Sequence, residues 1–194
     1  MRRIIALTMI LVLALAIANV HASGAAKKVI MIFAPNQFRD EELFETKKLL
    51  EDAGMTVKTA STKLGPAKGM LGGVAKADML ISDVKSNSFD AIVFVGGSGA
   101  EVLFDNKTAQ DLAKSFYSSG KLTAAICIAP VILANAGILQ GKQATVFNSE
   151  AGIIKAKGAQ YTGKNVTIDG KLITANGPGA VSEFANAIID ALGK

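Results

Sequence analysis

The chain has 194 residues, of which 50% are hydrophobic, and its 21 basic and 16 acidic side chains give a formal net charge of +5. This hydrophobic content supplies enough apolar surface for one layered domain of ordinary size. The basic excess is mild and spread along the chain, so we expect no nucleic-acid partner. A single cysteine excludes an intrachain disulfide.

Residues 1–22 have the pattern of a secretory signal. Arg2 and Arg3 form a basic start, residues 4–18 are nearly all apolar, and Val20-His21-Ala22 offers small residues around a cleavage point. The apolar run is shorter than a comfortable membrane span, which favours a removed signal over a retained anchor. We therefore expect a periplasmic or extracellular protein whose single domain covers residues 23–194 and has no membrane contact.

Apolar runs rich in β-branched residues alternate with segments of helical spacing along the rest of the chain. The predicted strands are 28–34, 56–60, 91–95, 122–126 and 143–147. The predicted helices are 40–52, 108–118 and 182–192. Residues 165–168 and 171–174 flank Asp169-Gly170 and resemble a hairpin. This alternation predicts an α/β fold with a mostly parallel sheet.

Cys127 follows the predicted strand 122–126 directly and precedes Pro130, which suits the first turn of a helix. The cysteine is thus predicted at the corner of a strand-turn-helix elbow, where Ala125 and Ala129 are small enough for close approach. Free N–H groups at a helix start lower the pKa of a thiol and favour a thiolate. A buried structural cysteine remains the alternative, because free cysteines are commonly core residues.

The only histidine, His21, lies in the predicted signal, so the mature chain would carry no imidazole. Any chemistry must then use the thiol with backbone dipoles and carboxylates. One cysteine without histidine leaves only carboxylates as metal ligands, so we expect no metal site and no cofactor.

Two further segments are predicted at the same sheet edge as Cys127. Gly96-Gly97-Ser98-Gly99 follows the strand 91–95, and its N–H groups could face an oxyanion or carboxylate. Arg39-Asp40-Glu41-Glu42 follows the first strand, although a charged first turn is more often a solvated helix start. Gly177-Pro178-Gly179 is interpreted as a structural break before the last helix, with no functional role.

Together these segments resemble the ThiJ/PfpI family of the DJ-one superfamily. The landmarks are 28–34 with 38–43, 94–97, 124–127 and 173–179, and the resemblance covers almost all of the predicted mature chain. It implies a flavodoxin-like three-layer sandwich with a nucleophilic cysteine at an elbow, and it suggests a homodimer.

The resemblance also assigns roles to single residues. It implies that Glu42 lies against the sulfur of Cys127, is protonated because burial raises its pKa, and serves as general acid or base. The backbone groups of Gly97 and Ile128 would donate to an oxyanion or to an oxidised cysteine. Ser98 would border the pocket, and Arg39 could pair with Glu42 or bind an anionic substrate.

This sequence also departs from the family pattern. Ile128 stands where many relatives have histidine, and Phe147 or Asn148 stands where others recruit one. Arg39 falls where the family often has an acid. A Cys-His peptidase is therefore not expected.

The resemblance and the residues leave three functions open. The first is a cofactor-independent enzyme of glyoxalase or deglycase type, in which Cys127 adds to a small reactive carbonyl and Glu42 shuttles the proton. The second is a redox-responsive or protective protein whose Cys127 is oxidised to sulfinate. The third is a non-catalytic binding domain, because the fold alone does not decide among these functions.

Overall fold

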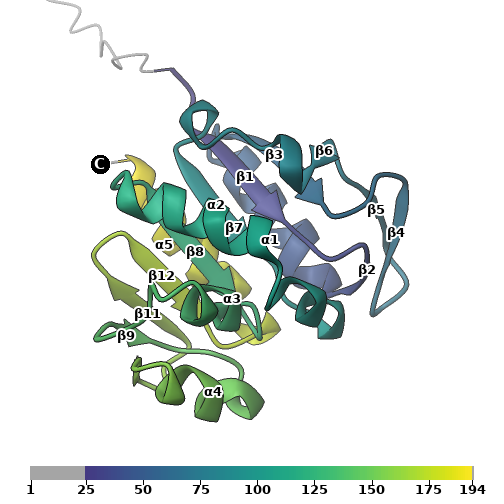
Figure 1. Cartoon of the computed structure of the whole chain (residues 1–194). Helices are drawn as coiled ribbons and strands as arrows, with labels where there is room; N and C mark the ends of the chain where they lie inside the picture. Colours follow the sequence, from purple (N-terminus) through teal and green to yellow (C-terminus); the bar gives the residue numbers. More distant parts are fainter. Residues whose placement is uncertain (1–24, 194) are drawn as a thin grey trace, which may run out of the picture.

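The central sheet of the computed structural model, which describes residues 25–193, has seven strands in the order β11-β12-β8-β7-β1-β3-β6 (Figure 1). All neighbours are parallel except the edge pair β11 and β12. The predicted signal, residues 1–22, lies outside the described residues. The strands are β1 (Lys28–Ile32), β3 (Thr56–Ser61), β6 (Met79–Leu80), β7 (Ala91–Phe94), β8 (Leu122–Ile126), β11 (Val166–Asp169) and β12 (Leu172–Ala175).

Helices cover both faces of this sheet. Figure 1 shows α2 (Lys107–Ser118) in front of it, and α3 (Pro130–Asn135) packs on the same face. The opposite face is covered by α1 (Asp40–Asp52) and α5 (Val181–Gly193), which also contact each other. Each face of the sheet packs a hydrophobic core against its helices. β1 supplies Ile30 and Ile32 to the core under α2 and α3, and Val29 and Met31 to the core under α1 and α5. Burial on both faces explains the continuous apolar runs, and the flavodoxin-like three-layer fold is confirmed.

The prediction of a strand over 143–147 is wrong for most of that segment. Only β9 (Gln143–Ala144) forms, and it pairs with β10 (Gln160–Tyr161) outside the central sheet. The place beside β8 is taken by β12, to which the segment is tied by a 2.9 Å bond from the N–H of Thr145 to Oγ1 of Thr174. The segment therefore packs alongside β12 and ends at Phe147, whose N–H donates to the carbonyl of Cys127.

The predicted hairpin is present, and its second strand became an inner strand of the sheet. Asp169 pairs with Leu172, so the turn consists of Gly170 and Lys171, one residue later than predicted. Gly170 has a φ of +62°, which glycine adopts without strain. Because β12 is parallel to β8, the residues that follow β12 reach the same sheet edge as Cys127.

A small second sheet lies beside this edge. It contains β2 (Asn36–Phe38), β4 (Pro66–Gly69) and β5 (Val74–Lys76). The carboxylate of Asp40 accepts bonds from the N–H groups of Leu71 (2.8 Å) and Gly73 (2.7 Å), which fastens the β4–β5 turn to the start of α1. This anchoring holds Met70 in the same turn.

Short elements complete the connections. They are α4 (Ala151–Ala156) and the 3-10 turns η1 (Ile81–Asp83), η2 (Ser86–Ser88), η3 (Ser98–Leu103), η4 (Asn148–Glu150) and η5 (Pro178–Ala180). Within residues 25–193, none of the helices has both the length and the apolar content needed to span a membrane.

Candidate active site

Cys127 lies on a strained corner between β8 and α3. Its φ is +64°, a left-handed backbone value that residues other than glycine rarely adopt. The corner is held on both sides, since its N–H donates to the carbonyl of Ala175 (2.9 Å) and its carbonyl accepts from the N–H of Phe147 (2.8 Å). Only 7% of the residue is exposed. The predicted nucleophile elbow is present.

Glu42, in the first turn of α1, is fully buried near this thiol. Its Oε2 accepts a 2.9 Å bond from the N–H of Gly96, whereas Oε1 is buried without a regular hydrogen-bond partner among residues 25–193. Burial raises the pKa of Glu42 to about 7, and hydrogen bonds from Cys127 and Gly96 limit that rise. A carboxyl with this pKa exchanges protons readily near neutral pH.

The pKa of Cys127 is raised, not lowered as its place before a helix start predicts. Burial and the negative charge of Glu42 raise it to about 12, while the N–H groups of Gly97 and Ile128 act on the sulfur in the opposite direction. The expectation failed because the following helix α3 has only six residues and gives a small dipole, whereas the thiol is almost fully enclosed. The resting sulfur is thus a thiol with an ionisable carboxyl beside it.

Gly96 and Gly97 let the β7 turn pass close to this pair. A Cβ at Gly96 would lie 2.5 Å from the Cβ of Cys127 and 2.7 Å from Oε2 of Glu42. The N–H of Gly96 faces the carboxylate of Glu42, and a carboxylate is one of the two groups predicted for the N–H groups of this turn. Gly97 has a φ of +94°, and its N–H is directed at the sulfur.

Arg39 pairs with Glu41 and not with Glu42, which was one of the two alternatives predicted for it. Its guanidinium makes two bonds to the Glu41 carboxylate, of 2.8 and 2.9 Å. Such a bidentate pair neutralises most of the positive charge at this position. Arg39 is therefore a poor anchor for an anionic substrate.

A cavity of about 280 Å³ opens above Cys127. Predicted residues line it, namely Cys127, Gly97, Ser98, Ile128 and Arg39, while Glu42 and Gly96 lie behind the thiol. The cavity walls also include Met70, Glu101, Phe147, Ser149, Glu150 and Pro178. Within residues 25–193, no group of three metal-ligating side chains comes together.

A sequence model of the DJ-1/PfpI family matches residues 27–191. The chain belongs to this family. It is 42% identical over 170 residues to the uncharacterised protein MJ0967 of Methanocaldococcus jannaschii, covering 86% of this chain and 83% of that one. The crystal structure of a ThiJ/PfpI domain protein from Brachyspira murdochii is 39% identical, with a TM-score of 0.85 over 88% of this chain and 98% of that one.

Two further DJ-1/PfpI relatives have names that state an activity. The deglycase PfpI of Pyrococcus furiosus is 31% identical over 150 residues, which are 77% of this chain and 90% of that one. The glutathione-independent glyoxalase DJR-1.2 of Caenorhabditis elegans is 30% identical over 169 residues, which are 87% of this chain and 90% of that one. These relatives support a general function of glyoxalase or deglycase type.

Several walls of this cavity were missed from the sequence. Pro178 is predicted only as part of a structural break, although its place after the strand β12 indicates the same sheet edge as Cys127. Phe147 was recognised only as the replacement of a histidine. No sequence pattern places Met70 at the site, because it reaches the cavity through a turn that Asp40 fastens to α1. Its sulfur accepts from the N–H of Ser98 at 3.4 Å.

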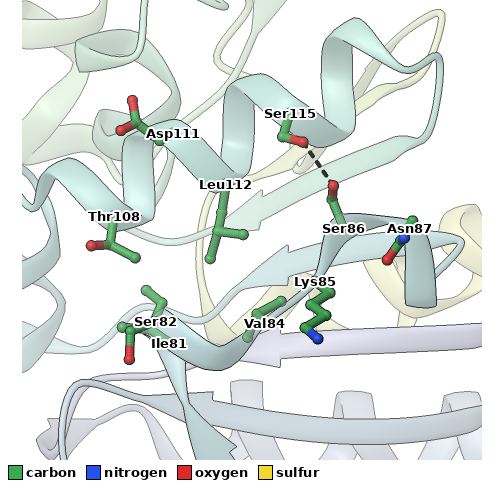
Figure 2. A pocket seen from close by; sticks show the side chains of 10 residues that line it. All are labelled: Ile81, Ser82, Val84, Lys85, Ser86, Asn87, Thr108, Asp111, Leu112 and Ser115. Atoms are coloured by element: carbon green, nitrogen blue, oxygen red, sulfur yellow. Dashed lines mark hydrogen bonds between the residues drawn. The ribbon is translucent and has the colours of Figure 1, made fainter.

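A larger hollow of about 540 Å³ lies between α2 and the segment containing η1 and η2 (Figure 2). Ser86 and Ser115 meet across it in a 2.8 Å hydrogen bond, and Asp111 on its rim is paired with Lys107. It contains neither the thiol nor a buried acid. It therefore lacks the reactive groups that line or adjoin the smaller cavity above Cys127.

Proposed function

We propose that this DJ-1/PfpI protein is a cofactor-independent enzyme that acts on small reactive carbonyls such as 2-oxoaldehydes. One observation carries the proposal: a fully buried carboxyl, with one oxygen lacking a regular partner and a pKa of about 7, lies against the only thiol of the chain. The relatives named glyoxalase and deglycase support the same chemistry. The pattern of residues 1–22 supports the further proposal that the enzyme works after export.

Addition of the thiol to the aldehyde would be the first step. The sulfur of Cys127 forms a bond to the aldehyde carbon, and its proton passes to the ionised carboxylate of Glu42. This transfer removes the need for a resting thiolate, because the base accepts the proton as the bond forms. The N–H groups directed at the sulfur, from Gly97 and Ile128, lie where they can stabilise negative charge near the reacting atoms.

Conversion of the adduct would follow at the same pair. Glu42 returns its proton to the former aldehyde oxygen and then removes the hydrogen of the sulfur-bearing carbon as a proton, which leaves an enediolate. It delivers this proton to the neighbouring carbonyl carbon, while the hydroxyl proton passes from the former aldehyde oxygen to the oxygen of that neighbouring carbon, giving a 2-hydroxy thioester. Water then releases the 2-hydroxy acid and restores the thiol. With methylglyoxal the sum is one aldehyde plus one water giving one lactate, so no oxidant or reductant is needed.

The charges around the cavity favour uncharged carbonyl compounds. Glu101 and Glu150 line it, and the positive charge of Arg39 is offset by Glu41. A substrate carboxylate would meet net negative charge at the entrance. We therefore propose that methylglyoxal is used better than an anionic aldehyde such as glyoxylate.

The test is lactate formation from methylglyoxal by the purified protein lacking residues 1–22. We expect Cys127→Ser to abolish turnover and Glu42→Gln to lower kcat by about 10²–10⁴, the usual contribution of a positioned acid or base. Glu45→Gln is the matched control, because Glu45 is an exposed acid on the same helix. Turnover no faster than that of Cys127→Ser would refute the proposal.

A second function has one observation in its favour. The N–H groups of Gly97 and Ile128, together with a protonated Glu42, could hold the oxygens of a sulfinate on Cys127. The raised thiol pKa opposes it, since the thiolate is the form that attacks peroxide. Intact mass after graded peroxide treatment separates the two functions, because a stable gain of two oxygens would favour this one.

A further inference from the structure

Two hollows lie next to each other at the carboxyl edge of the sheet and share two walls. The cavity above Cys127 has a volume of about 280 Å³, and a second hollow of about 390 Å³ lies beside it. Phe147 and Pro178 line both. The second hollow is otherwise lined in part by Asn148, Tyr161 and Asn176, whose side chains offer amide and phenol groups.

The backbone of Phe147 is fixed relative to the reacting thiol. Its N–H donates to the carbonyl of Cys127 (2.8 Å), and its own carbonyl accepts from the N–H of Glu150 (2.9 Å). The ring lies over Gly177, where a Cβ would come within 3.3 Å of Cδ2 of the ring. The backbone of Phe147 is therefore fixed by the elbow, and its ring lies between the two hollows beside a glycine.

The ring itself is only half packed. Phe147 is 45% exposed, in contrast to the fully buried phenylalanines of the core. Turning it away from Pro178 would give up little buried apolar area, so the free-energy cost of that movement is small. A wall that is fixed at its backbone and loosely packed at its side chain suits control of access.

We propose that Phe147 determines the size of the carbonyl compound that reaches Cys127. With the ring in place, the thiol is open to compounds as small as a 2-oxoaldehyde. When the ring is turned or removed, the two hollows become continuous, and the second one receives the aryl or hydroxylated chain of a longer aldehyde. The substrate class rests on the proposed function, whereas the control of access does not.

Alkylation of the thiol tests control of access without any turnover. Cys127 is the only cysteine, so intact mass reports its modification directly. Iodoacetamide is the small reagent and N-phenylmaleimide the large one. We expect Phe147→Ala to raise the rate with N-phenylmaleimide, relative to that with iodoacetamide, by about tenfold or more, the size of discrimination that an apolar wall provides. Phe147→Trp is expected to lower the same ratio.

Phe44→Ala is the matched control. Phe44 on α1 is 38% exposed, packs edge to face on Phe38 and lines neither hollow. Its ratio of rates should stay at the wild-type value. Phe147→Leu, which keeps an apolar side chain of smaller size, is measured alongside in case Phe147→Ala does not fold, and it should raise the ratio in the same direction. An unchanged ratio in the folded Phe147 variants overturns the proposal.

Turnover separates this inference from the proposed function. Relative to wild type, Phe147→Ala should raise kcat/KM for phenylglyoxal over that for methylglyoxal by about tenfold. If neither carbonyl is converted while the alkylation ratio shifts as expected, the proposed function fails and control of access by Phe147 stands. If both carbonyls are converted and neither ratio moves, Phe147 does not control access and the proposed function stands.

Discussion

Replacing Glu42 by glutamine should change how the stability of the protein depends on pH. The pKa of this carboxyl is raised by burial from 4.5 to about 7 in the folded chain. Between these values the folded state holds a proton that the unfolded state has lost, so the free energy of unfolding falls as pH rises. At about 1.4 kcal/mol per pH unit, the full difference amounts to about 3 kcal/mol.

Glutamine has the shape of the protonated acid and does not ionise. Its oxygen can accept from the N–H of Gly96, so Glu42→Gln should resemble wild type near pH 4.5 and become more stable than wild type by about 3 kcal/mol near pH 8. Urea unfolding of both proteins across this pH range measures the difference between their free energies of unfolding. The contributions of the other acids cancel in that difference. Glu45→Gln should give a curve parallel to wild type. A parallel curve for Glu42→Gln would refute the assignment of a raised pKa to Glu42.

Three further changes test the geometry around the pair. Gly96→Ala would place a Cβ 2.5 Å from the Cβ of Cys127 and should lower the free energy of unfolding by about 1–3 kcal/mol in the same urea assay. Gly152→Ala is the control, because Gly152 lies in open space on α4, and it should raise the free energy of unfolding slightly. Cys127→Gly relieves the positive φ and should be about 1 kcal/mol more stable than Cys127→Ala by thermal unfolding; equal stability would contradict strain at the elbow. The double variant Glu101→Gln, Glu150→Gln should raise kcat/KM for glyoxylate relative to methylglyoxal about fivefold at low salt, and no change would show that these carboxylates do not select against anions.

The elements with strong local signals were predicted well. The strand 122–126 and the helix 40–52 have the predicted bounds, because an apolar run and an acidic first turn followed by helical spacing depend on nearby residues alone. The elbow followed from the order strand, cysteine, proline. The placement of Glu42 required the resemblance to the family, since a charged first turn by itself is usually solvated.

What failed depended on contacts between distant segments. The segment 143–147 has the composition of a strand, but β12 occupies the place beside β8. The pairing of Arg39 with Glu41 is a choice of side-chain conformation among adjacent acids. The thiol pKa was predicted from the helix start, whereas burial and the neighbouring carboxyl outweigh the dipole of a six-residue helix. Export through residues 1–22 and assembly as a dimer stay predictions.

The central claim is that Glu42 accepts the proton of Cys127 when the sulfur attacks. The rate of Cys127 alkylation by iodoacetamide as a function of pH tests this claim most directly. In wild type we expect a first rise centred near pH 7, where Glu42 becomes ionised, and in Glu42→Gln this rise should be absent. The same rise near pH 7 in both proteins would contradict proton transfer to Glu42.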